Sequence, residues 1–433
     1  MKLPPDHPLR TELNDEVHAR PPDALAAPVR VSYLALFSDG ADREREWGAV
    51  RDLADRFDAS PPAPGAVHYG ADLGAFRMTW ERHTEFVRFS FAFPGASGHG
   101  ASGDPFDESG MEAVPPDWLA SLPGQVMVAA RAAVLPAADA PPATRDIQAR
   151  LFADNPLVGA TIAGGAGTAL TDFHIHPDGH GRFLVFDRGM PPLQAGRMVQ
   201  RLLEMDTYRV LALLALPVAR DLAPHLAANE RELARITAAL ATAAPADEPA
   251  LLDRLTRIAA GLESRQADNL YRFGAAVAYG ELVQRRVVEL REARIQGLQT
   301  FREFTERRLV PALNTCRAAA SRQESLSRRV ARATVLLSTR VDITSELQTR
   351  AVLESMNRRA KLQLRLQRTV EGLSVAAVTY YVVGLVDYAA KGLLASGVDI
   401  SPALATGVSL PLVAAATMLG LRRIRAMFAP RGA

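Results

Sequence analysis

One short segment, Asp172-Phe173-His174-Ile175-His176, holds the residues best suited to chemistry, because its polar and apolar side chains alternate. On a β-strand, Asp172, His174 and His176 would share one face. Such a face can ligate a metal or perform acid–base work, since histidine titrates near neutral pH. A solvated strand face gives the same pattern, and we expect that simpler arrangement here.

The N-terminus carries a second cluster, in which histidines, carboxylates and arginines crowd together. Its members are His7, Arg10, Glu16, His18 and Arg20. An anion site, a metal site or a docking peptide would suit these residue types, but their spacing matches no metal-binding signature. We therefore favour an N-terminal arm that ion pairs hold in place, ended by Pro21 and Pro22.

The other motifs do not indicate catalysis. The segment Gly164-Gly165-Ala166-Gly167-Thr168 lacks the Gly-Lys-Ser/Thr of a phosphate loop, so a hairpin turn is expected. Cys316 is the only cysteine, which excludes a disulfide or a cysteine-based metal cluster within one chain. With no nucleophile–base pair and no metal set visible, we expect no enzyme and no cofactor, although a divalent cation stays open.

Charge and proline divide the 433 residues into two contrasting halves. Residues 1–280 have a net charge of −10 and residues 281–372 one of +9, and 25 of the 29 prolines lie at or before Pro249. Proline interrupts helix interiors, so the second half is free to form long helices. The whole-chain balance of +2 argues against a nucleic-acid partner, whose binding protein would be strongly basic.

We expect an α+β cytoplasmic head over residues 1–216, followed by long helices. Its predicted strands are rich in β-branched and aromatic residues and cover 29–37, 75–81, 85–93, 125–135, 157–162 and 182–187. Helices are expected at 41–57, 193–216 and 220–243. Residues 217–311 form a helical region with a helix at 250–310, and 312–372 a basic stalk helix.

A C-terminal transmembrane hairpin is expected at residues 373–421. The segments 373–390 and 403–421 carry one charge and none, and each is close to the roughly 20 apolar residues that a span needs. Arginines and lysine flank both segments, which places both termini in the cytoplasm of a bacterium, at its inner membrane. These residues either set topology alone or also contact anionic lipid: Arg358, Arg359, Lys361, Arg365, Arg368, Arg422, Arg423 and Arg425. A basic tail, 422–433, follows.

Asp387 is the one carboxylate inside a predicted span. A charge there is costly and usually faces a partner or a pathway. Because Asp387 lies three residues before the end of its span, an interfacial position explains it equally well.

Three segments resemble an uncharacterised bacterial family of membrane-anchored proteins. They are HPLRTELNDEVHARPP at 7–22, EMDTYRVLALLALPVAR at 204–220 and RRAKLQLRLQRTVEGLSVAAVTYYVVGLV at 358–386. This resemblance covers the whole chain and implies membrane anchoring, with no activity attached.

The layout from about residue 250 onward also resembles CorA-type divalent-cation transporters. That family forms pentamers in which the first span lines the pore, and it carries Gly-Met-Asn after that span. Here the corresponding residues 388–393 are Tyr-Ala-Ala-Lys-Gly-Leu, which puts magnesium selectivity in doubt. Position alone indicates Tyr380, Tyr381, Gly384 and Asp387 as pore-lining candidates in a homo-oligomeric ion transporter. The alternative is a non-conducting scaffold or sensor whose acidic head binds a protein partner.

Overall fold

The computed structural model describes residues 6–11, 13–14, 22–38, 40, 42–95, 104–106, 110–137, 144–397 and 399–428. The chain forms two compact units. The head unit comprises Met1–Thr242 and Ala250–Thr334, and the hairpin unit comprises Ala243–Pro249 and Val335–Ala433. An α+β part followed by long helices is therefore confirmed.

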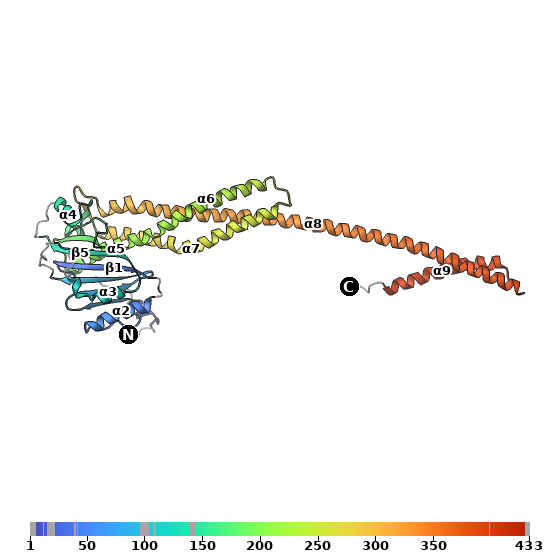
Figure 1. The fold of residues 1–433 in the computed structure, drawn as a ribbon, viewed down its shortest axis with the longest axis horizontal. Coiled ribbons are helices and arrows are strands. Elements are labelled where there is room, and N and C mark those ends of the chain that lie inside the picture. The colour runs from blue at the N-terminus through green and yellow to red at the C-terminus, as the bar shows by residue number, and fades with distance from the viewer. Residues whose placement is uncertain are drawn as a thin grey trace. The chain divides into compact units, whose positions relative to one another are not determined.

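A nine-stranded mixed sheet organises the head unit, in the order β2-β3-β4-β1-β5-β8-β7-β6-β9 (Figure 1). Only the β5–β8 pair is parallel among the ladders of the sheet. The strands are β1 (Val29–Phe37), β2 (His68–Asp72), β3 (Arg77–Arg82), β4 (Phe86–Pro94), β5 (Gln125–Pro136), β6 (Val158–Ile162), β7 (Gly167–Thr171), β8 (Gly181–Asp187) and β9 (Ala293–Arg294). All six predicted strands are confirmed, and β2, β7 and β9 are additional.

Helices cover both faces of this sheet. On one face, α2 (Arg43–Arg56) and α3 (Pro116–Ser121) bury an aromatic cluster that includes Trp80, Phe89 and Trp118. Also on this face, α4 (Thr144–Leu151) adds a second core around Ile147 and Phe152. The opposite face packs against α5 (Pro192–Leu213). Since side chains alternate along a strand, each central strand contributes side chains to both faces of the sheet. Short 3-10 turns occupy Met111–Ala113 and Ala163–Gly165.

Three long helices lie side by side beyond the sheet (Figure 1). They are α6 (Ala215–Leu240), α7 (Glu248–Glu289) and the first part of α8 (Phe301–Ala395). Ion pairs join them: Arg322 of α8 contacts Glu230 of α6 at 2.5 Å, and Arg254 of α7 contacts Glu232 of α6 at 2.5 Å. The α8 residues Leu326 and Val330 are buried.

The predicted division between helices at Pro311 is wrong. Pro311 lies inside α8, and the chain between α7 and α8 spans residues 290–300 instead. A capping box explains the true start: the Thr300 hydroxyl accepts from the amide of Glu303, and the Glu303 carboxylate accepts from the amide of Thr300. Pro311 is exposed, so water can satisfy the helix carbonyl that proline leaves without a donor.

The hairpin unit contains the end of α8 and α9 (Pro402–Phe428). Residues 396–401 connect the two helices, with Gly397 at φ 93°. The Thr406 hydroxyl of α9 donates to Asp387 Oδ1 of α8 at 3.2 Å. Each of these helices is long and apolar enough to cross a membrane by length and composition, and so is the α5–α6 stretch, Pro192–Leu240.

Candidate functional site

The described residues bring the strongest concentration of buried charge to the sheet face beneath α5. Arg88 of β4 donates to Glu204 of α5 at 2.7 Å and to Glu81 of β3 at 2.5 Å. Arg286 of α7 reaches the other oxygen of Glu204 at 2.5 Å, and Gln200 also donates to Glu204. Residues of β4, α5 and α7 thus meet at the Glu204 carboxylate, and β3 joins them through Arg88.

Mutual pairing keeps this cluster charged although it is buried. Burial raises the pKa of Glu204, but Arg88 and Arg286 outweigh that effect and hold the pKa below its usual range. For Arg88, burial acts to lower the pKa, and Glu204 and Glu81 raise it overall. A buried charge that keeps its partners is tolerated, whereas removal of one partner is strongly destabilising. The cluster therefore fixes the positions of α5 and α7 on the sheet.

A belt of tyrosines extends the cluster toward α7. Tyr208 of α5 stacks on Tyr279 of α7 with ring centroids 5.7 Å apart, and burial raises the pKa of Tyr208 to about 12. Glu85, in the β3–β4 turn, accepts hydrogen bonds from Tyr271 at 3.1 Å and from Arg272 at 2.5 Å. This second buried carboxylate ties α7 to the tip of the β3–β4 hairpin.

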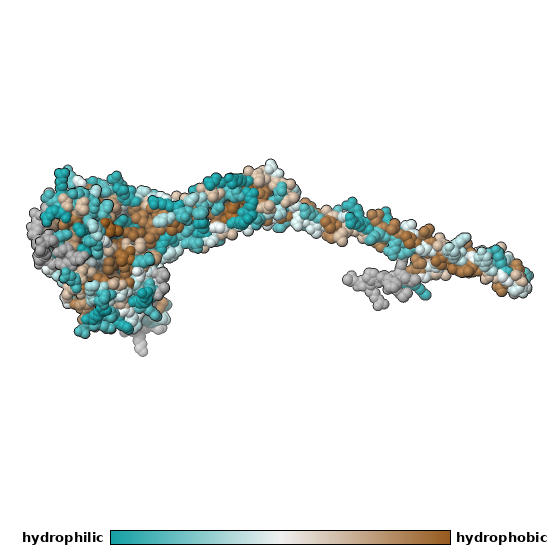
Figure 2. Space-filling view, viewed as in Figure 1, coloured by the Kyte–Doolittle hydropathy of each residue, from teal (hydrophilic) through white to brown (hydrophobic). Residues whose placement is uncertain are grey.

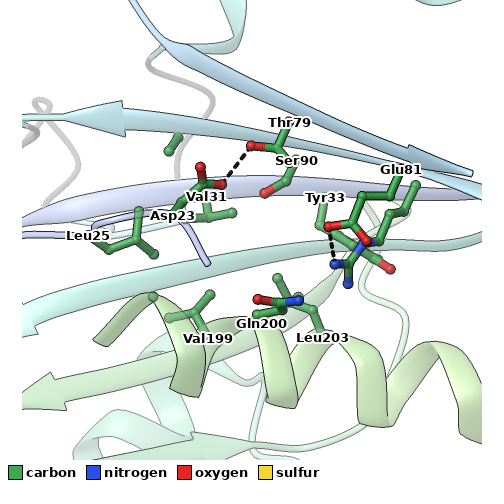
Figure 3. Close-up of a pocket in the computed structure, with 13 residues that line it drawn as sticks. Asp23, Leu25, Val31, Tyr33, Thr79, Glu81, Ser90, Val199, Gln200 and Leu203 are labelled. Atoms are coloured by element: carbon green, nitrogen blue, oxygen red, sulfur yellow. Dashed lines mark hydrogen bonds and ion pairs between the residues drawn. The ribbon is translucent and has the colours of Figure 1, made fainter. Parts of the chain in front are cut away.

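A small polar cavity of about 40 Å³ lies beside Arg88 and Glu81 (Figure 3). Ser90 and Gln200 also line it, on β4 and α5. That volume holds about one to three water molecules, far below the roughly 300 Å³ or more of a metabolite site. The cavity can hydrate the charge cluster, but it is too small to receive an organic substrate.

The segment that follows the N-terminal motif closes this cavity. Asp23 accepts from Arg77 at 2.8 Å and from the Thr79 hydroxyl at 2.7 Å, as Figure 3 shows for Thr79. Leu25 donates its amide to the carbonyl of Pro192. A Cβ at Gly196 would lie 1.7 Å from the Asp23 carbonyl oxygen, so only glycine allows this approach. Residues 22–25 therefore form a strap across α5.

The Asp172–His176 segment is not a solvated strand face, so that prediction is wrong for two of its three residues. β7 ends at Thr171, and Asp172 and His176 are both buried and joined by a 2.9 Å hydrogen bond. Asn155 donates to the same carboxylate at 2.8 Å. Of the three polar residues of this segment, only His174 is exposed. Within the described residues, no group of three His, Cys, Asp or Glu side chains could hold a metal.

This Asp–His pair has a structural consequence at Phe173. Phe173 adopts a positive φ of 55°, an unusual conformation for an aromatic residue. Its ring stacks on Phe304 of α8 at 4.3 Å between centroids, and the guanidinium of Arg209 lies 5.1 Å from it on α5. The loop thus connects the sheet to the first turn of α8.

The remaining head motifs have structural roles where they are described. Gly164 and Gly165 form the β6–β7 turn, which confirms the predicted hairpin. Arg10 pairs with Asp6, and the amide of Leu9 donates to His7 Nδ1 at 3.2 Å. Glu16, His18 and Arg20 lie outside the described residues. Cys316 is buried, and that burial raises the pKa of its thiol.

The four pore-lining candidates do lie together in the hairpin unit. Tyr380, Tyr381, Gly384 and Asp387 line an open groove of about 950 Å³ between α8 and α9. Asp387 is not alone in this groove, because Lys391 contacts its carboxylate at 2.7 Å. The side chain therefore already has a cation and a hydroxyl as partners, and a role in a pore stays a prediction.

The basic residues that flank the apolar segments are exposed where their side chains are described. On α8 these are Arg358, Arg359, Lys361, Arg365 and Arg368, and on α9 they are Arg422 and Arg423. Arg425 belongs to α9, but its side chain lies outside the described part. Such exposure is compatible both with setting topology and with binding anionic lipid.

Reasoning from sequence missed most of the charge cluster. Glu204 lies in one of the segments that carry the family resemblance, but Glu81, Arg88 and Arg286 were not singled out. One signal was available for Arg88: it is the only charge in the strand Phe86–Pro94 (FVRFSFAFP), where a buried partner is required. Its partner Glu204 lies 116 residues further along the chain, so no local pattern identifies it.

A family model matches nearly the whole chain. Residues 5–428 match a family described as "Protein of unknown function (DUF3422)", which confirms the resemblance to an uncharacterised family. No curated protein matches the chain. Neither result supports the resemblance to CorA-type transporters, which stays a prediction.

Proposed function

The chain belongs to the DUF3422 family, and we propose that it is a membrane-anchored, homo-oligomeric protein of transporter-like build. The observation that carries this proposal is α8, which begins beside the sheet and continues as one helix through the apolar segment 373–390. A helix that only anchored a domain would not need to originate within the fold of that domain. The geometry of α8 instead suits the transmission of changes between the head and a membrane segment.

Burial separates the two C-terminal apolar helices from the third candidate. A third of the apolar window in Pro192–Leu240 is buried within the chain, against 6% for α8 and 0% for α9. The α5–α6 stretch also holds Glu204, with its two arginine partners, so we assign it to the head core. Figure 2 shows exposed hydrophobic residues on the C-terminal part of α8 and on α9. Lipid would cover this apolar surface.

The charge pattern supports an orientation in which both termini are cytoplasmic. Exposed cationic residues precede the apolar part of α8 and follow the apolar part of α9. Residues 391–402, which lie between the two apolar segments, carry only Lys391 and Asp399 as charged side chains. The head and the basic part of α8 would then lie in the cytoplasm, and the inner membrane of a bacterium fits this arrangement.

Transport requires more than one chain, because two spans cannot enclose a pore. The hairpin would supply polar groups to a shared pathway from Tyr380, Tyr381 and Asp387, which lie along one groove. An ion with its hydration shell partly removed would exchange contacts with such groups. The ion itself is open, and a divalent cation would be the first to test.

Native mass spectrometry of the detergent-solubilised chain, followed by ion flux in liposomes, tests this proposal. We expect a closed ring of about five chains and a flux that falls at least tenfold in Asp387→Ala. Asp399→Ala, in the connection outside both apolar segments, is the matched control and should leave flux unchanged. A monomer or dimer, or equal flux in wild type and Asp387→Ala, would contradict the transporter.

A non-conducting scaffold or sensor is the second candidate, and the pairing of Asp387 favours it. A carboxylate already neutralised by Lys391 and bonded to Thr406 suits a structural role better than ion binding. This candidate predicts no flux in any variant and a protein partner on the acidic head. Cross-linking in membranes, with the partner recovered from wild type but not after charge reversal on the exposed face of α2, would support it.

A further inference from the structure

We propose that residues 341–373 of α8, here called the stalk segment, pack against the same segment of other copies of this chain in a parallel, in-register bundle. The contact surface is one apolar stripe made of Val341, Val352, Met356, Leu366, Val370 and Leu373. This inference rests on the proposed oligomer and specifies where the copies meet.

The stripe continues a line of side chains that is already buried within one chain. At about 100° per residue, Leu326, Val330 and Leu337 fall within about 40° of one another on the α8 surface, and all three are buried. The six stripe residues fall within about 100° of that same line. The same side of the helix therefore changes from covered to uncovered as the chain leaves the bundle with α6 and α7.

Val341 is partly covered within the described chain, but from Val352 onward the stripe is open. Val352 is 58% exposed, and the exposed fractions of the stripe residues from Met356 to Leu373 lie between 57% and 73%. A long helix in water gains most of its stability from packing an apolar face, so such a segment needs a partner. Several large apolar side chains on one line make a second helix the best-fitting cover.

Charge indicates which side faces the partner. Relative to the buried line, the cationic residues lie between about 220° and 300° around the helix, opposite the stripe. They are Arg350, Arg358, Lys361, Arg365 and Arg368. Like charges repel at close range, so copies of the segment would meet through the apolar stripe and keep the basic side outward, towards solvent and anionic lipid.

Arg359 lies within the stripe, so copies that meet there must leave this guanidinium in contact with water. A parallel arrangement follows because all copies would enter the membrane from the same side.

Cysteine cross-linking of the full chain in native membranes tests the stripe. Cys316 is the only cysteine, so Cys316→Ser gives a clean background. In that background we would compare Val352→Cys with Leu353→Cys, since these neighbours are 58% and 59% exposed but point about 100° apart. A second pair, Leu366→Cys and Leu364→Cys, repeats the comparison closer to the apolar segment 373–390.

With a short bismaleimide, we expect Val352→Cys and Leu366→Cys to form covalent dimers and higher species at least five times more than their controls. Equal cross-linking of Leu353→Cys and Leu364→Cys would overturn the stripe. Cross-linking at only one of the two stripe levels would overturn the parallel register, because antiparallel helices match identical positions at a single crossing. The proposal would also be contradicted if every cross-linked product joined this chain to a different protein.

The flux experiment tests transport, and the cross-linking experiment tests the bundle, so each proposal can fail without the other. Stripe-specific cross-links without ion flux would leave the bundle established and contradict transport. Flux with no stripe-specific cross-link would leave transport established and contradict the bundle.

Discussion

The head unit and the stalk segment differ in how far their charged and apolar side chains are buried. In the head, Glu81, Arg88 and Glu204 are buried, and Arg88 joins the two carboxylates although Glu204 lies 116 residues away from it in the sequence. In the stalk segment, charged and apolar side chains alike are exposed, and the ion pair of Arg350 with Glu346 lies on the helix surface. The head therefore buries its large apolar side chains within its own fold, whereas most large apolar side chains of the stalk segment are exposed.

This contrast predicts that the two regions respond to mutation through different measurements. Head substitutions should change the free energy of unfolding, and stalk substitutions should change assembly. All three tryptophans, Trp47, Trp80 and Trp118, lie in the head. Their fluorescence therefore follows unfolding of the head alone, even in the full-length protein.

The largest effect is expected for Glu204→Ala. It leaves the buried Arg88 and the half-buried Arg286 without their shared partner, which should lower the free energy of unfolding by about 3–5 kcal/mol. The measurement is chemical denaturation followed by tryptophan fluorescence. Glu232→Ala is the matched control, because it removes a carboxylate with two arginine partners at the helix surface. The control should cost much less, because ion pairs at the surface contribute little to stability. Equal losses in the two variants would contradict the importance of the buried cluster.

The same carboxylate predicts how stability depends on pH. Because the folded-state pKa of Glu204 lies below its ordinary value of 4.5, its contribution is complete above that value. It is lost as the pH falls further, through the folded-state pKa. The gap in unfolding free energy between wild type and Glu204→Gln should thus narrow as the pH falls below 4.5. A gap that stays constant down to pH 3 would contradict this account.

A smaller loss is expected at the strap. Gly196→Ala places a methyl group where the Asp23 carbonyl lies, and overpacking of this kind costs about 1–3 kcal/mol. Gly274→Ala, at a helix position with open space, is the control and should be neutral or stabilising by up to about 1 kcal/mol. Hydrogen exchange at residues 22–25 should rise in the first variant only.

Substitutions in the stalk segment should affect assembly and leave the stability of the head unchanged. Val352→Lys with Leu366→Lys should weaken assembly at least tenfold, which corresponds to about 1.4 kcal/mol, without changing the tryptophan-monitored unfolding of the head. Leu353→Lys with Leu364→Lys controls for added charge. Subunit stoichiometry by native mass spectrometry provides the readout, and head destabilisation by the stripe pair would erase the distinction between the regions.

The smallest effect concerns the positive φ of Phe173. Phe173→Ala and Phe173→Gly both remove the ring that stacks on Phe304. Glycine adopts this conformation freely, so the Gly variant should be more stable than the Ala variant by about 1 kcal/mol. The reverse order, which ordinary loop flexibility would produce, would show that the loop relaxes once the ring is lost.

How much could be predicted from sequence depended on the range of the interactions. The strands of the sheet and the apolar segments were visible because they follow from local composition and periodicity. The start of α8 was also encoded locally, in Thr300-Phe301-Arg302-Glu303, but Pro311 drew attention away from it. The charge cluster was beyond local reasoning, because strand register and the packing of α5 and α7 bring its members together.

The connection between α7 and α8 has a mechanical consequence. Here β9 adds only two residues to the sheet edge, and the Glu292 carboxylate accepts the amides of Phe301 and Arg302 at the start of α8. Tension applied along α8 would first load its contacts with α6 and α7, such as the Arg322–Glu230 ion pair, and then these few bonds and the stacked phenylalanines. A pull that exceeds the helix packing would therefore change the edge of the sheet before it changes the central strands.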